Sequence, residues 1–195
     1  TALGVLLGLG QISLHKTLRK TSWALTQFFR NAPWLVLLFF AMFLLPFELR
    51  FGVVVIPLPA WFKAIIGLSL PVMANVAEIV RGGILSVPRG EIEAARAAGM
   101  SVFTAYRLVI LPRAFSIILP AYSNEVIILM KGTALASTIT LLELMGVSQL
   151  AASATYQPIQ VFAIAGAIYY LLTLIITRVF RLLEARYNRY MIAAR

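Results

Sequence analysis

Long apolar runs alternate with short basic segments along the whole chain, a pattern that is typical of a polytopic membrane protein. The apolar runs cover residues 1–14, 33–47, 60–80, 114–130 and 158–179. A helix needs about 20 apolar residues to cross a bilayer, so we expect the first run to be the remainder of a truncated helix. The second run is also short, and because Pro33 suits a first helical turn we expect this helix to extend forward to Phe51. The predicted fold class is all-α, with about five transmembrane helices.

The segments between the apolar runs predict the remaining structure. Residues 48–59 contain Pro57 and Pro59, which break helices, and we expect an outer loop there. Residues 131–154 are rich in Ser, Thr, Ala and Gly, and predict the end of a spanning helix followed by a re-entrant or outer helix around 141–150. The spacing of Gly4 and Gly8 favours close packing of the first helix against a neighbour.

Composition and charge support the membrane assignment. The chain is 61% hydrophobic and 12% charged, whereas a soluble domain is roughly half apolar and a quarter charged. A net charge of +10 would indicate nucleic acid in a soluble protein, but here Lys and Arg gather between apolar runs, as cytoplasmic loops require. They concentrate in residues 16–30, 81–113 and 178–195. We therefore place these three segments in the cytoplasm and expect membrane lipid, not nucleic acid, as a partner.

The same composition argues against several kinds of chemistry. The chain has no cysteine and a single histidine, His15, so a thiolate or His-based metal site is not expected. No phosphate-binding, dinucleotide-binding or zinc motif is found, and no acid, base and nucleophile set can be assembled. We expect neither a cofactor nor an enzymatic activity in this chain.

Residues 81–113 form the one long stretch in which charge, glycine and small residues replace apolar runs. Pro88 and Gly99 interrupt this stretch, and Ser101 is a candidate N-cap. We therefore predict two short amphipathic helices that meet near Gly99, the second of which ends at Leu111.

The first of these helices is a candidate docking element. Its small residues, including Ala94 and Ala95, would allow close approach to a groove on another protein, and Glu93 would add an orienting charge. Alternatively, the small residues pack only against their own chain, and Glu93 pairs with Arg96 at i+3.

Polar side chains within the predicted spans are the candidates for chemistry. Charge at membrane depth is costly and is expected to face the bundle interior or a wet cavity. The strongest candidate for a substrate pathway is Glu125, beside Asn124; Lys131 shares a helical face with Asn124. Thr133 and Ser137 continue this polar lining. The set would suit a zwitterion with hydrogen-bonding groups, and the alternative is a structural network between Glu125 and Lys131.

Asn75 and Glu78 are weaker candidates for the same pathway. With Pro71 they fall on one stripe of the span at 60–80. Glu78 lies close to the end of this span, and the alternative is that it pairs with Arg81 at i+3.

The stretch 81–113 resembles the EAA signature of permease subunits from bacterial ATP-binding-cassette (ABC) importers, with Val109 where the family usually has isoleucine. Over residues 30–190 the chain is similar to the polar amino-acid subfamily, which includes histidine, arginine, glutamine and opine permeases. The segments that carry the similarity are RNAP at 30–33, AEIVRGGILSVPRGEIEAARAAGM at 77–100, LPAYSNEVIILMKGTALAS at 119–137 and YQPIQVFAIAGAIYY at 156–170.

The resemblance implies a single type I permease domain over residues 1–195, with a cytoplasmic coupling loop at 81–113. It implies a subunit of an importer of polar amino acids in the bacterial inner membrane, with its N-terminus outside and its C-terminus in the cytoplasm. The implied partners are a pair of ATPase subunits, in which ATP hydrolysis resides, a second permease that is identical or a sister, and a periplasmic or lipid-anchored amino-acid-binding protein.

The resemblance also assigns roles to residues. The positions that match the coupling signature are Glu93, Ala94, Ala95, Gly99, Leu111 and Pro112. The positions that match the substrate route are Asn124, Glu125, Lys131 and Thr133. Gly132 stands where many relatives carry aspartate, which removes an anion that would hold a basic substrate group, although the surrounding pattern is closest to the basic amino-acid and opine branch.

Two other functions fit parts of the pattern. An ion-coupled secondary transporter would use Glu125 as its ion or proton site, and it predicts an internal repeat, which we do not find. A membrane anchor would recruit a cytoplasmic enzyme through residues 91–113, and it predicts that changes at Asn124 and Glu125 have no effect.

Overall fold

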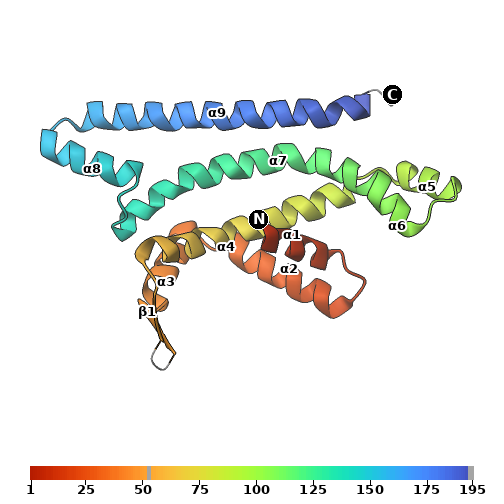
Figure 1. Cartoon of the computed structure of the whole chain (residues 1–195), viewed down its shortest axis with the longest axis horizontal. Coiled ribbons are helices and arrows are strands. Elements are labelled where there is room, and N and C mark those ends of the chain that lie inside the picture. Colours follow the sequence, from red (N-terminus) through yellow and green to blue (C-terminus); the bar gives the residue numbers. More distant parts are fainter. Residues whose placement is uncertain (52–53, 193–195) are drawn as a thin grey trace.

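The computed structural model describes the backbone of residues 1–51 and 54–192, and the side chains of residues 1–50 and 55–187. Apart from one hairpin, the described elements are helical (Figure 1), which confirms the all-α fold class. In order they are α1 (Ala2–Gln11), α2 (Lys16–Asn31), α3 (Trp34–Leu44), β1 (Glu48–Phe51), β2 (Val54–Pro57), α4 (Ala60–Leu85), α5 (Arg89–Ala97), α6 (Val102–Ala105), a π-helical turn (Tyr106–Ile110), α7 (Leu111–Gly132), a 3-10 segment (Thr133–Ile139), α8 (Leu144–Thr155) and α9 (Pro158–Ile192).

Within this described part, three helical segments are long and apolar enough to cross a membrane: Ala60–Leu85, Val102–Ile139 and Pro158–Tyr187. A fourth candidate is the pair α2 and α3, which bends by 100° at the break between them. Together with the short apolar α1, these elements account for the predicted apolar runs. Figure 1 shows α4, α7 and α9 lying along the length of the molecule.

The bend between α2 and α3 corrects two expectations. The helix at 33–47 does not extend forward, because α3 ends at Leu44. The basic segment before it is not a loop but the amphipathic helix α2. Ala32 and Pro33 have extended backbones with ψ of 135° and 132°. Ala32 is extended because the residue before a proline is excluded from the helical region. The break therefore follows from Pro33.

The predicted outer loop at 48–59 contains an antiparallel hairpin. β1 pairs with β2 so that Glu48 lies opposite Pro57 and Leu49 lies opposite Ile56. β-Branched residues next to the turn favour extended backbone, which the loop prediction overlooked. Pro59 follows the hairpin and forms the N-cap of α4.

Helix α4 is the centre of the core. Its buried residues Val72, Val76 and Val80 form one hydrophobic cluster, and Leu68 joins a second cluster with Leu38 of α3. Helix α1 packs so closely on α4 that a Cβ atom added at Gly4 would lie 2.7 Å from the carbonyl oxygen of Met73. The close packing predicted from the glycine spacing is therefore confirmed.

The helix after Gly99 continues past Leu111, contrary to prediction. Ser101 caps its start by accepting a hydrogen bond from the Thr104 amide. The amide of Leu111 then bonds the carbonyl of Tyr106, five residues earlier. A proline normally clashes with the carbonyl four residues before it, and the wider π turn before Pro112 relieves this crowding. The second predicted helix is thus the first part of the span Val102–Ile139.

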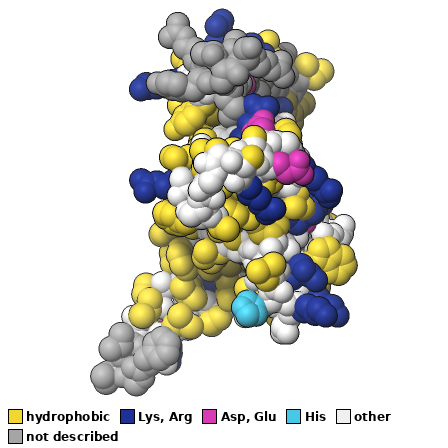
Figure 2. All heavy atoms as spheres, turned by 90° about the vertical axis from the view of Figure 1, so that its right-hand side faces the viewer, with side chains coloured by type: hydrophobic (Ala, Val, Ile, Leu, Met, Phe, Trp, Pro, Cys, Tyr) yellow, Lys and Arg dark blue, Asp and Glu magenta, His cyan; other side chains and the backbone are white. Residues whose placement is uncertain are grey.

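Basic side chains gather at one end of the molecule. The turn between α1 and α2, the short helices α5 and α6, and the end of α9 all lie toward this end (Figure 1). Seen from that end, Lys and Arg side chains far outnumber Asp and Glu (Figure 2). The predicted basic segments thus come together in space.

Candidate functional site

The segment with the coupling signature forms an exposed helix and a tight turn. Glu93 and Ala94 of α5 are exposed, whereas Ala95 is 5% exposed and packs against its own chain. The turn closes where the Met100 amide donates to the Ala95 carbonyl, and Gly99 has a φ of +73°. Glycine adopts this left-handed conformation without strain. Ala95 thus packs against its own chain, as the alternative interpretation states, whereas docking through the exposed Glu93 and Ala94 stays a prediction.

An ion pair and a small apolar cluster attach α5 to the base of α7. The Arg113 guanidinium lies 3.3 Å from the Glu91 carboxylate, and Val87 packs with Ile110 and Ala114. Within the described residues, Glu93 makes no ion pair with Arg96, so the alternative interpretation of Glu93 is not supported. Leu111 and Pro112 are both exposed at the start of α7.

Glu125 lies inside the bundle. Its side chain is buried, and it accepts a hydrogen bond of 3.0 Å from the Asn75 amide, which joins α7 to α4. The stronger candidate Glu125 and the weaker candidate Asn75 are thus hydrogen-bond partners. Asn124 is exposed, because neighbouring residues on a helix point about 100° apart.

The other predicted pathway residues lie away from Glu125. Lys131 and Thr133 are exposed. The hydroxyl of Thr133 donates to the Met130 carbonyl at 2.7 Å, and that of Ser137 donates to the Ala134 carbonyl at 2.8 Å. The polar residues that were predicted to form one lining are therefore divided: Glu125 pairs with Asn75 in the interior, whereas Lys131 and Thr133 lie on an exposed face. Within the described part of the chain, Glu125 and Lys131 do not form the network that the alternative predicted.

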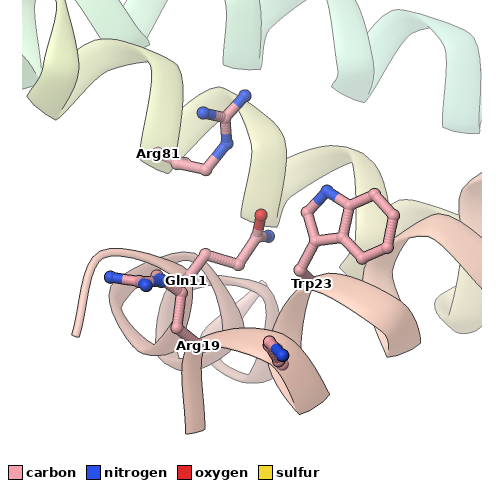
Figure 3. A pocket seen from close by; sticks show the side chains of 5 residues that line it. Gln11, Arg19, Trp23 and Arg81 are labelled. Atoms are coloured by element: carbon pink, nitrogen blue, oxygen red, sulfur yellow. The ribbon is translucent and has the colours of Figure 1, made fainter. Parts of the chain in front are cut away.

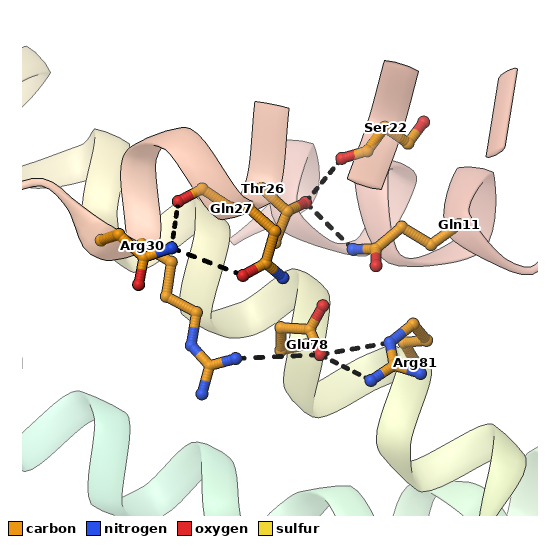
Figure 4. A network of polar contacts seen from close by, with 8 residues as sticks. Gln11, Ser22, Thr26, Gln27, Arg30, Glu78 and Arg81 are labelled. Atoms are coloured by element: carbon orange, nitrogen blue, oxygen red, sulfur yellow. Dashed lines mark hydrogen bonds and ion pairs between the residues drawn. The ribbon is translucent and has the colours of Figure 1, made fainter. Parts of the chain in front are cut away.

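Glu78 is held between two arginines (Figure 4). The Arg81 guanidinium donates to it at 2.7 and 3.1 Å from Nη2 and Nε, and Arg30 of α2 lies 3.9 Å away. The predicted pairing of Glu78 with Arg81 is confirmed. Beside this group, Gln11 donates to the Thr26 hydroxyl at 3.0 Å, which ties α1 to α2.

Lys63 is a buried charged residue whose role the sequence analysis missed. Its side chain is fully buried, and Nζ donates to the carbonyl oxygens of Leu45 at 2.7 Å and Met42 at 3.2 Å. It also lies 3.4 Å from the ring centroid of Phe47. The cation therefore caps the C-terminus of α3, where unpaired carbonyls attract positive charge. A lone lysine in an apolar helix was the available signal, because it requires an acceptor.

Comparison with known proteins decides the family. Residues 1–189 match the family described as binding-protein-dependent transport system inner membrane component. The chain belongs to this family. Its members are multi-pass proteins of the inner membrane, and this chain has the apolar helices that such a location requires.

Three curated relatives are permeases for amino acids or opines. The permease is 49% identical over 131 residues to the nopaline transport system permease protein NocM of Agrobacterium fabrum, covering 67% of this chain and 54% of the relative. It is 50% identical over 125 residues to the octopine transport system permease protein OccM of Rhizobium meliloti, covering 64% and 51%. The match to the histidine/lysine/arginine/ornithine transport system permease protein HisM of Salmonella typhimurium has 42% identity over 191 residues and covers 95% and 80%. The matched segment thus spans about half the length of the two opine permeases.

Solved structures share the fold of this chain. A chain of the crystal structure of an amino acid ABC transporter with histidines superposes with a TM-score of 0.82 at 33% identity, covering 95% of this chain and 84% of that one. The inward-facing MetNI methionine ABC transporter superposes with a TM-score of 0.70 at 22% identity, with the same coverage. The second similarity concerns the fold alone, and it agrees with the type I permease fold that the sequence predicts.

Proposed function

We propose that residues 1–195 form a single permease domain of an ABC importer that moves polar amino acids, of the basic or opine class, across the inner membrane. Support comes from the family and from relatives whose names specify nopaline, octopine, histidine, lysine, arginine and ornithine. The observation that carries the proposal is the exposed face of α5. This helix directly precedes the spanning segment Val102–Ile139, and its residues Glu93 and Ala94 are accessible to a partner.

In this proposal, residues 81–113 are the coupling loop. An ATPase subunit in the cytoplasm docks on Glu93 and Ala94, while Ala95 and the turn at Gly99 hold α5 in place. Leu111 and Pro112 lie where the coupling segment becomes α7. The Glu91–Arg113 ion pair at 3.3 Å makes α5 and the base of α7 move together. ATP hydrolysis resides in the ATPase subunit, and this chain transmits the motion.

The exposed polar face of α7 supports a substrate path shared with a second permease. Asn124, Lys131 and Thr133 are exposed, although uncompensated polar groups at membrane depth are costly. A second, identical or sister, permease would cover this face and enclose a polar route. Glu125 and Asn75 lie behind it as a buried pair, and Ser137 continues it along the helix.

The remaining assignments follow from the charge distribution. The basic end of the molecule (Figure 2) is placed in the cytoplasm, because positive charge is retained on that side. The C-terminus is then cytoplasmic, the N-terminus lies outside, and α8 faces the side on which an amino-acid-binding protein delivers substrate. Glu78, fixed between Arg30 and Arg81, holds α2 against α4 near the cytoplasmic end.

The competing functions have less support. An ion-coupled carrier would need Glu125 to exchange ions, but the family transports with binding proteins. A simple anchor would leave the exposed polar face of α7 without a role.

The test compares two matched substitutions in the intact membrane complex. Ala94→Arg places a long cation on the exposed face of α5, and Ala154→Arg makes the same change on exposed α8, at the opposite end (Figure 1). We expect Ala94→Arg to lose the co-purifying ATPase subunit and ATP-dependent uptake of basic amino acids, whereas Ala154→Arg retains the ATPase. If no ATPase co-purifies with the wild type and uptake follows a proton or sodium gradient, the proposal is wrong.

A further inference from the structure

A polar pocket opens between α1, α2 and α4, near the start of the proposed coupling loop, whose first residue Arg81 is part of the pocket lining. Its volume is about 380 Å³, and it is lined by Gln11, Arg19, Lys20, Trp23 and Arg81. In Figure 3 the amide of Gln11 lies between the side chains of Arg19 and Arg81, with Trp23 beside it. The spacing of Arg19, Lys20 and Trp23 places them on one side of α2.

The pocket carries excess positive charge. Arg81 is neutralised by Glu78 at 2.7 Å. Arg19 and Lys20 form no ion pair within the described residues, and both are exposed at the pocket. The indole N–H of Trp23 is a further hydrogen-bond donor, and it cannot act as an acceptor. This set of donors suits a phosphate or phosphodiester.

Gln11 adds an acceptor to this set of donors. Its side chain is only 5% exposed, and its Oε1 atom is buried without a hydrogen-bond partner. The orientation of the amide follows from its neighbour: the Thr26 hydroxyl donates to the Ser22 carbonyl at 2.8 Å and must therefore accept from Nε2 of Gln11. Oε1 consequently points away from Thr26, and a buried acceptor without a donor is costly. A ligand hydroxyl would satisfy it.

The position of the pocket indicates where such a ligand comes from. The pocket lies near the turn between α1 and α2, at the basic end of the molecule (Figure 1). Tryptophan is enriched at the membrane–water interface, and Trp23 is 56% exposed here. Basic pockets between membrane helices on the cytoplasmic side attract anionic headgroups.

We propose that this pocket binds a phosphate ester that bears a free hydroxyl, supplied by the headgroup of an anionic lipid such as phosphatidylglycerol. Arg19, Lys20 and the Trp23 indole bind the phosphate oxygens. The headgroup hydroxyl donates to Oε1 of Gln11. The bound lipid joins α1 and α2 to the basic end of α4 through Arg81. The site shares Arg81 with the proposed coupling loop, but it includes neither the proposed ATPase-docking residues Glu93 and Ala94 nor a residue of the proposed substrate path.

The test measures lipid binding to the full chain, purified in its membrane complex and delipidated in detergent, by native mass spectrometry. The probes are phosphatidylglycerol, phosphatidylmethanol, which has the same charge without a free headgroup hydroxyl, and zwitterionic phosphatidylcholine. We expect the wild type to prefer them in that order. Replacing both Arg19 and Lys20 by Gln should weaken binding of phosphatidylglycerol by about thirtyfold, because each basic residue near the surface contributes about 1 kcal/mol. The same double change at Arg181 and Arg186, exposed on α9, should leave it unchanged.

A second variant separates the hydroxyl from the phosphate. Gln11→Met should abolish the preference for phosphatidylglycerol over phosphatidylmethanol while keeping both above phosphatidylcholine, and comparing lipids on one variant removes any effect on folding. Displacement by millimolar sn-glycerol 3-phosphate would assign the same chemistry to a soluble ligand, and its failure to displace assigns it to the lipid. Equal binding by the Arg19/Lys20 and Arg181/Arg186 variants, or equal binding of the two anionic lipids to the wild type, would overturn the proposal.

Discussion

Buried polar side chains inside this chain are held by specific neighbours. Glu125 is 5% exposed and accepts a hydrogen bond from Asn75, and Lys63 is fully buried against two backbone carbonyls. Burying such a group without its partner costs more than the hydrogen bond itself contributes. Removing one partner should therefore be worse than removing both.

Asn75→Leu should destabilise the permease by about 1–3 kcal/mol, because the buried Glu125 carboxylate loses its donor. Thermal unfolding of the purified complex in detergent measures this effect. The double variant Asn75→Leu with Glu125→Met should recover most of the loss, since neither polar group is then left unpaired. A double variant that is as unstable as the sum of the two single variants would contradict the importance of this bond.

Lys63→Met should destabilise the protein by at least about 2 kcal/mol, because two buried carbonyls at the end of α3 lose their donor. The same thermal unfolding assay applies. Lys16→Met is the matched control: Lys16 is exposed at the start of α2, and its replacement should change stability by no more than about 0.5 kcal/mol. Equal effects of the two changes would show that the cap of α3 contributes nothing.

At the scale of elements, contact between α1 and α4 depends on glycine. Cβ atoms built at Gly4 and Gly8 would each lie 2.7 Å from a backbone carbonyl oxygen of α4. Helices can approach this closely only where side chains are absent. In contrast, a Cβ atom built at Gly82, which lies in α4, would meet no neighbouring atom within 4 Å.

Gly4→Ala should therefore destabilise the permease by about 1–3 kcal/mol through overpacking. Gly82→Ala adds the same methyl group without a contact, and it should be neutral or stabilising by up to about 1 kcal/mol, because alanine is the better helix former. The two midpoints of thermal unfolding should move in opposite directions or by clearly different amounts. A Gly4 variant as stable as the wild type would mean that α1 does not pack on α4 as described.

Sequence reasoning predicted the elements better than their contacts. Apolar runs, Pro33 and Gly99 are local signals, and they indicated the spans, the break before α3 and the turn after α5. The pairing of Asn75 with Glu125 joins residues 50 positions apart, and no local signal specifies it. The continuation of the helix through Pro112 was missed because it depends on a π turn, whose geometry sequence periodicity does not reveal. The predicted pathway residues still await a test.

At the scale of the whole molecule, charge is distributed unequally along the length of the bundle. The chain has 17 Lys and Arg against 7 Asp and Glu, and the basic end of the molecule is visible in Figure 2. The hairpin and α8 lie toward the other end (Figure 1). In the proposed topology, the positive-inside rule places these two ends on opposite sides of the membrane.

This assignment predicts the sidedness of labelling in intact cells. Residues 1–195 contain no cysteine, so a single introduced cysteine is the only thiol within these residues. Ala98→Cys, next to the exposed turn after α5, should react with a membrane-impermeant maleimide only after the membrane is opened. Gln157→Cys, exposed between α8 and α9, should react in intact spheroplasts. The reverse pattern would invert the proposed topology.

The length of the second spanning segment has a mechanical consequence. Val102–Ile139 has 38 residues, so at about 1.5 Å per residue it measures about 57 Å, whereas the hydrocarbon core is about 30 Å thick. A tilt of about 10° around its midpoint would displace each end by about 5 Å, close to one helical turn. A small rotation within the bilayer is thus amplified into a large stroke at the aqueous end, where α5 is attached.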